Sequence, residues 1–168
     1  MCGGSGGSSG KGGGGGGPNA GLQQIQSQII AAGGAEKFVE STKSKSLSQE
    51  DRKQISSEQM GRISNLYMQK SDFKTPIKVD GTTKFYANKD NSMIVAKVKG
   101  KPAAYVLKAE GYTTIVTAKE YTGKGLGKQT MKAFYNKNPD YVKKTGGFTP
   151  AGKKAFTSVM KDIQAGKF

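Results

Sequence analysis

The sequence contains no histidine and no tryptophan, and it has a single cysteine and two arginines, Arg52 and Arg62. Without histidine the chain cannot form a Ser-His-Asp triad or a histidine metal site, and it lacks the most common general base. Cys2 alone can form neither an intrachain disulfide nor a cysteine zinc cluster. The scarcity of arginine disfavours bidentate recognition of DNA bases, which depends on the guanidinium group. These absences exclude several classes of enzyme and site.

Long apolar runs are also missing. No stretch approaches the roughly 20 residues that a membrane-spanning helix needs. The first residues lack the hydrophobic region of a signal peptide, and Met1-Cys2 is not the Met-Gly start that myristoylation requires. We therefore expect a protein that is made in the cytoplasm and has no membrane span.

Lysine, in contrast, is abundant. The chain has 27 lysines and arginines against 12 acidic residues, a net charge of +15, and residues 95–168 hold fifteen lysines and four acidic residues, a difference of +11. Such an excess favours a polyanionic neighbour, nucleic acid or an acidic protein, mainly through neutralisation of phosphates. The alternative explanation is a charged surface that serves only solubility.

The first part of the chain divides into a glycine-rich arm, residues 1–18, and a helical and linker segment, residues 19–47. The arm holds eleven of the 25 glycines and has almost nothing to bury, so it should not fold alone. In the next segment Leu22, Ile25, Ile29 and Ile30 recur at helical spacing before Gly33-Gly34, which predicts a short helix. Its apolar stripe either docks on the parent domain or, behind a flexible arm, binds a partner subunit.

Residues 48–168 are predicted to form one α+β domain. Ser48 and Asp51 have the spacing of a capping box before a helix that continues to Tyr67. The last helix is predicted to start at Pro150, with Thr149 as its N-cap, and to end at Gly166. Its apolar face comprises Ala155, Phe156, Val159, Met160 and Ile163.

Between these helices the pattern changes to short runs typical of strands. The predicted strands are Lys84 to Ala87, Met93 to Lys99, Ala103 to Lys108 and Tyr112 to Ala118, separated by Asn88-Lys89-Asp90, Gly100-Lys101-Pro102 and Glu110-Gly111. Connections this short imply an antiparallel meander. The predicted fold class is therefore α+β, with a mainly antiparallel sheet, N-terminal helices and a C-terminal helix.

The segment from Tyr112 to Tyr135 is the most informative part of the sequence. Residues 113–117 are all β-branched, as suits a half-buried strand, and a helix is predicted to start within two residues of Gly127. The glycines between them remove side chains where backbone amides converge at a helix N-terminus. This arrangement suits an anion such as a phosphate or pyrophosphate. A tight turn without any ligand is the alternative.

The region from about residue 84 to residue 135 resembles the central core of the GNAT acetyltransferase superfamily. In that family the fourth strand leads into an Arg/Gln-x-x-Gly-x-Gly/Ala loop that holds the pyrophosphate of acetyl-CoA, and Thr122-Gly123-Lys124-Gly125-Leu126-Gly127 occupies this motif here. Thr122 stands where the family has Arg or Gln. Because only 33 residues follow Tyr135, the resemblance implies an abbreviated form of the fold. The residues that it implies for acetyl-CoA binding are Gly123, Lys124, Gly125, Leu126, Gly127 and Lys128.

The same resemblance implies candidates for acetyl transfer, which needs a deprotonated amine and a protonated thiolate leaving group. Glu110 and Glu120 flank the strand before the loop and are the candidate bases, directly or through water. Tyr135 and Tyr141 are the candidate acids. Solvated carboxylates and packed tyrosines are the alternative explanations of these four residues. No group of residues predicts a metal site.

The start of the chain, Met-Cys-Gly-Gly followed by a glycine run, resembles the starts of internal or tail-associated proteins of bacterial viruses. The favoured hypothesis is a structural or assembly component of a bacteriophage particle, built on a degenerate GNAT-like scaffold and incorporated into the virion. Residues 1–34 would attach it to neighbouring subunits, with Leu22, Ile25 and Ile29 as the partner-binding residues, and the lysine-rich half would face nucleic acid. The alternative hypothesis is an acetyl-CoA-dependent N-acetyltransferase.

Overall fold

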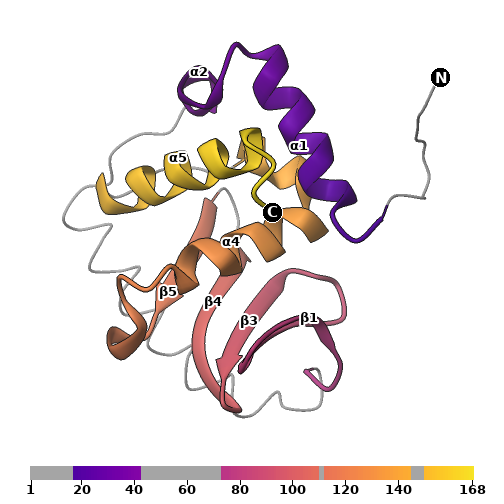
Figure 1. The fold of residues 1–168 in the computed structure, drawn as a ribbon, viewed down its shortest axis with the longest axis vertical. Coiled ribbons are helices and arrows are strands. Elements are labelled where there is room, and N and C mark those ends of the chain that lie inside the picture. Colours follow the sequence, from indigo (N-terminus) through magenta and orange to yellow (C-terminus); the bar gives the residue numbers. More distant parts are fainter. Residues whose placement is uncertain (1–16, 43–72, 110–111, 145–149) are drawn as a thin grey trace.

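The structure, a computed structural model, describes residues 17–42, 73–109, 112–144 and 150–168. In these ranges two helices come first, followed by five strands and a helical C-terminal region (Figure 1). The elements are α1 (Ala20–Ala31), α2 (Ala35–Ser41), β1 (Pro76–Asp80), β2 (Thr83–Ala87), β3 (Met93–Val98), β4 (Lys101–Ala109), β5 (Tyr112–Thr117), the 3-10 helix η3 (Lys119–Tyr121), α4 (Leu126–Lys137), the 3-10 helix η4 (Pro139–Lys144) and α5 (Pro150–Gln164).

The five strands form one sheet in the order β1-β2-β3-β4-β5, and every neighbouring pair is antiparallel. Tight turns make this meander possible. At the β3–β4 turn both Lys99 and Gly100 have positive φ, 51° and 81°, which matches the twist of a two-residue hairpin. The α+β fold class with a mainly antiparallel sheet is thereby confirmed.

Three details of the sheet and helices differ from the sequence prediction. Strand β1 was not predicted, and Lys101 and Pro102, predicted as part of a turn, belong to β4 because Lys99-Gly100 alone make the connection. Ile30, expected on the apolar face of the first helix, is 60% exposed. The predicted helix over residues 48–67 lies outside the described residues, as do Thr149 and the predicted Glu110-Gly111 turn.

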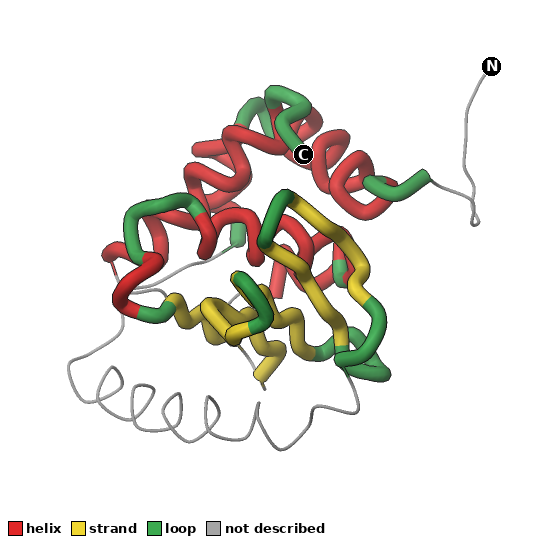
Figure 2. The backbone as a smooth tube through the Cα atoms, turned by 60° about the horizontal axis from the view of Figure 1, so that its bottom comes forward, coloured by secondary structure: helices red, strands yellow, loops and turns green. Residues whose placement is uncertain are grey.

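The described helices are stacked on one side of the sheet (Figure 2). Helix α4 lies against β3, β4 and β5, and α1 and α5 pack against α4. In β3 and β4 the side chains alternate between the two faces. Ile94 and Val106 belong to the large core that includes the helices, whereas Val95 and Tyr105 join Phe73 in a second cluster on the opposite face. Both faces of the sheet are therefore buried at its centre.

The N-terminal helix is part of this core. Gly21 lies so close to the end of α4 that a Cβ atom there would overlap the carbonyl oxygen of Asn136. The Asn136 side chain fixes the contact, because its Oδ1 accepts from the Leu22 backbone N–H (3.2 Å) and its Nδ2 donates to the Pro18 carbonyl (2.6 Å). Residues far apart in the sequence thus join the first helix to the centre of the fold.

We predict that Gly21→Ala lowers the free energy of unfolding by about 2–3 kcal/mol, because the added methyl forces α1 away from α4. Chemical denaturation monitored by circular dichroism measures it. Gly17→Ala is the matched control, since a Cβ at residue 17 meets nothing within 4 Å. Equal stability of the two variants would contradict this account of the α1–α4 contact.

Candidate functional site

The glycine loop between β5 and α4 is the first candidate site. The end of β5 is held by a hydrogen bond from the Ala118 N–H to the Ala103 carbonyl (2.8 Å), and η3 follows directly. Gly123 and Gly125 both have φ of 80°, and Gly125 immediately precedes α4. The helix begins at Leu126, within one residue of the predicted Gly127.

The glycines of this loop have different structural roles. Gly123 and Gly125 adopt the left-handed conformation that side chains disfavour, and both are exposed with nothing within 4 Å of an added Cβ. At Gly127 an added Cβ would lie 2.9 Å from the Thr117 Oγ1. The first two glycines are thus required by the path of the chain and the third by the packing of α4 on β5. The loop leaves its backbone open to solvent at the N-terminus of a helix.

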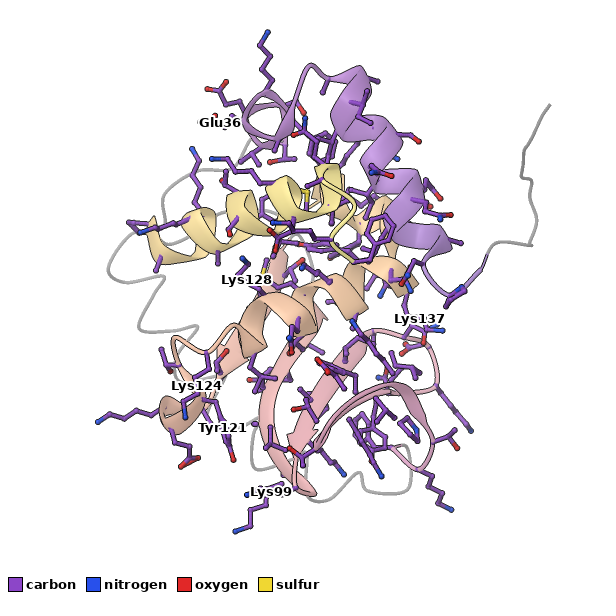
Figure 3. The ribbon with its side chains drawn as sticks, in the orientation of Figure 1. Glu36, Lys99, Tyr121, Lys124, Lys128 and Lys137 are labelled. Carbon is purple, nitrogen blue, oxygen red and sulfur yellow. The ribbon has the colours of Figure 1, made fainter. Side chains whose placement is uncertain are left out.

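The two lysines predicted to bring charge to the loop point in different directions. Lys124 is exposed beside the loop, and its Nζ lies 6.0 Å from the centre of the Tyr121 ring. Lys128 instead points between α4 and α5 (Figure 3), where its Nζ lies 3.3 Å from the Asp162 carboxylate. The expectation that Lys128 serves the loop is corrected, because α5 supplies its counter-charge.

Asp162 is the centre of a small charged network inside the helical layers. Its Oδ2 accepts from Lys132 (3.0 Å) as well as from Lys128, and the Lys132 side chain is only 11% exposed. Burial alone would raise the pKa of the Asp162 carboxyl, but hydrogen bonds from Lys132 and Lys128 and their positive charges outweigh it and lower the pKa. The network is structural, since it ties α4 to α5.

The residues predicted for acid and base chemistry are not gathered around the loop. Tyr135 is completely buried and makes edge-to-face contacts with Phe134 and Phe156. Glu120 is exposed in η3 beside the loop, and Glu110 lies outside the described residues.

Tyr141 lies in η4, beyond the C-terminal end of α4. The Lys108 Nζ is 5.0 Å from the centre of its ring, and burial raises the pKa of its hydroxyl. Gly125 and Tyr135 are separated by ten residues, or about 15 Å along the helix axis. The loop and the two tyrosines therefore lie at opposite ends of α4.

The predicted partner-binding residues are part of the chain's own core. Leu22, Ile25 and Ile29 are 2%, 0% and 0% exposed and pack in the cluster that contains α4 and α5. This corrects the expectation that the stripe on α1 faces a neighbouring subunit. Of the two explanations of the stripe, docking on the parent domain is the one that the structure supports.

Four exposed lysines lie at the end of the sheet where β5 leads into the glycine loop, and we call them the lysine edge: Lys99, Lys101, Lys119 and Lys124. The register pairs Val98 with Lys101 and Ala104 with Thr117, so the β3–β4 turn and the exit from β5 leave the sheet at the same end. Lys99 and Lys124 accordingly lie toward the same lower part of the molecule in Figure 3. The sequence alone does not reveal this group, because only strand pairing brings Lys99 and Lys101 to the same end of the sheet as the loop.

Comparisons with protein-family models, with curated proteins and with solved structures give no match to this chain. Within the described ranges no helix has the length and apolar character to cross a membrane. The same residues contain no group of three or more acidic or cysteine side chains able to hold a metal ion.

We predict that Asp162→Asn lowers the free energy of unfolding by about 1–2 kcal/mol at neutral pH, because it leaves Lys132 buried without its counter-charge. Since the pKa of Asp162 is lowered in the fold, its contribution is complete above the ordinary aspartate pKa and disappears as the pH falls through the folded value. Denaturation curves from neutral to strongly acidic pH measure this, with Glu40→Gln on the exposed part of α2 as control. A difference from wild type that stays constant down to the most acidic pH would contradict it.

Proposed function

We propose that this protein is a structural or assembly component whose lysine surface holds a polyanionic partner, nucleic acid in a bacteriophage particle being the expected one. The supporting observation is the shortage of internal counter-charge. The described residues include 20 lysines and seven acidic residues, a difference of +13. In this part of the chain only Lys128 and Lys132 form ion pairs with Asp or Glu side chains, both with Asp162, so the other 18 described lysines have no such carboxylate within 4 Å.

Exposed lysines without counter-charge favour phosphate backbones in particular. Each phosphate that a lysine neutralises releases condensed counterions, which supplies affinity without sequence recognition. Lysine is a point charge on a flexible stem, so a group such as the lysine edge tolerates an irregular nucleic acid path. The near-absence of arginine fits packaging or attachment better than sequence reading.

Several observations weigh against acetyl transfer as the main activity. After α4 the described chain continues as η4 and α5, and no strand in the described ranges pairs with the free edge of β5. In the GNAT family a further strand completes the acetyl-CoA cleft. Thr122 replaces the phosphate-facing Arg or Gln, and Tyr135 is buried. A GNAT-like scaffold without a complete cleft is consistent with an assembly role.

N-acetyl transfer with acetyl-CoA remains the second candidate because of one feature. The open backbone at Gly123 and Gly125 precedes the free N–H groups of α4, an arrangement that favours an anionic group. Lys124 supplies nearby charge, and exposed Glu120 is the remaining candidate base on the loop side.

The lysine edge should contribute to nucleic acid binding. We predict that replacing Lys99, Lys101, Lys119 and Lys124 together by alanine lowers affinity for a random-sequence duplex about tenfold or more and reduces the slope of log K against log salt by about 3 to 4. Fluorescence anisotropy over a salt series measures both quantities. Binding that is independent of salt in the wild-type protein would contradict the proposal.

A matched control removes the same charge elsewhere. Replacing Lys37, Lys153, Lys154 and Lys161 on α2 and α5 by alanine changes net charge equally but leaves the sheet end intact. We expect a smaller loss of affinity for this variant. If the two quadruple variants lose the same affinity, the lysine edge has no special role and only net charge matters.

Acetyl-CoA distinguishes the two candidate functions. If the second candidate is right, calorimetry detects acetyl-CoA binding, and Gly125→Asp abolishes it while Gly125→Asn retains much of it. Both substitutions place a similar side chain at the left-handed position, but only aspartate repels the pyrophosphate. If the folded protein gives no heat change at millimolar acetyl-CoA, acetyl transfer is ruled out and the assembly function remains.

The proposed docking role of the N-terminal region needs a narrower test than removal of residues 1–34. Such a deletion would take away α1 with Leu22, Ile25 and Ile29 and leave a hole in the core. Removing residues 2–16 spares α1 entirely. The docking proposal for this arm is wrong if the shortened protein enters the particle at the normal copy number.

A further inference from the structure

The β1 edge of the sheet has an unusual surface. β1 pairs only with β2 and lies at the opposite side of the sheet from β5 (Figure 1). Four of its five residues are exposed. Ile77 and Val79, 36% and 57% exposed, are two of the three large exposed apolar residues in the described part of the chain. The register of β1 against β2 shifts between Pro76 and Lys78, so Ile77 lies at an irregularity, whereas Lys78, Val79 and Asp80 pair in regular register with β2.

An exposed edge strand carries unpaired N–H and C=O groups that can accept another strand. Proteins often block such edges with charge or proline. Pro76 removes a donor only at the first position of β1, and Lys78 and Asp80 alternate with the two apolar residues. The regular part of this edge therefore offers backbone groups, the exposed Val79 side chain and one charge of each sign.

We propose that two copies of this chain associate through their β1 strands, paired antiparallel about a two-fold axis at Val79. In this register the two Val79 side chains face each other and Lys78 of each copy faces Asp80 of the other. Shifting the register by one residue in each strand, to an axis at Lys78, would set the two lysines opposite each other, so charge selects the Val79 register.

The side chains are already on the required faces. Lys78 pairs across β1–β2 with Phe85, and its Nζ lies 5.7 Å from the centre of that ring and 3.4 Å from the Phe168 carbonyl oxygen. Asp80, two residues away, shares this face, is exposed and has no ion pair within the described part of the chain. A second copy supplies the counter-charge that Asp80 lacks.

The association is weak. A five-residue strand buries less area than a standard protein interface, and a net charge of +15 on each copy opposes approach. Salt screens this repulsion over about 10 Å at moderate ionic strength, so added salt promotes dimerisation. Nucleic acid binding responds to salt in the opposite direction, which separates this proposal from the proposed function.

Sedimentation equilibrium from micromolar to millimolar protein tests the pairing. Asp80→Lys turns both Lys–Asp pairs into like-charge pairs and should weaken dimerisation about tenfold. Glu40→Lys adds the same charge on α2, away from β1, and should change the dimerisation constant by no more than about twofold. The double variant K78D/D80K exchanges the charges and should recover association relative to Asp80→Lys.

Hydrogen exchange identifies the surface. The backbone amide of Val79 and the other β1 amides that point away from β2 should gain protection as wild-type protein concentration rises, and those of the β3–β4 turn should not. The proposal is overturned if the wild-type chain stays monomeric at millimolar concentration in high salt, in which case the edge is open to a segment of another protein. It is also overturned if Asp80→Lys associates like wild type, or if association occurs without protection of these β1 amides.

Discussion

The position of α4 between the sheet and the outer helices is the constraint on which the rest of the structure depends. Its residues 130–135 are six in succession and all are buried, whereas a surface helix buries only one stripe. A helix enclosed on both sides must satisfy its polar groups internally. Thr130 does so by donating to the Leu126 carbonyl (2.7 Å), and Lys132 does so through Asp162. Close approach of its neighbours also requires glycine at residues 21 and 127.

This enclosure determines which side chains remain for interaction with other molecules. Tyr135 and Lys132 have the chemistry of catalytic groups but are used to pack and neutralise the interior. The groups that stay accessible lie at the periphery: the glycine loop, the exposed lysines and the edge of β1. All three favour contacts with other large molecules through charge or backbone. These accessible groups are consistent with the attachment role proposed above.

Much of the fold was predictable because it rests on local signals. Strands β2 to β5 follow runs of β-branched and apolar residues, and α4 starts where the glycines end, at Leu126. β1 was missed because its sequence is short, begins with proline and contains two charges. The candidate site was less predictable. Sequence periodicity shows that α1 has an apolar face, but only tertiary packing shows that α4 and α5 cover it. The direction of the Lys128 side chain likewise depends on Asp162, which lies 34 residues later in the sequence.

The packing of the first two helices against α5 has a consequence for how the chain folds. The Ala35 N–H donates to the Gln164 Oε1 (3.0 Å), and the Gln26 side chain donates to the Gln164 carbonyl (3.2 Å), contacts that span 129 and 138 residues of sequence. During synthesis α5 cannot cover the apolar stripe of α1 until α5 itself has emerged from the ribosome. The meander of β1 to β5, whose contacts are local, can form before that. Closure of the core thus depends on α5, and Leu22, Ile25 and Ile29 stay uncovered by α5 until that helix has been made.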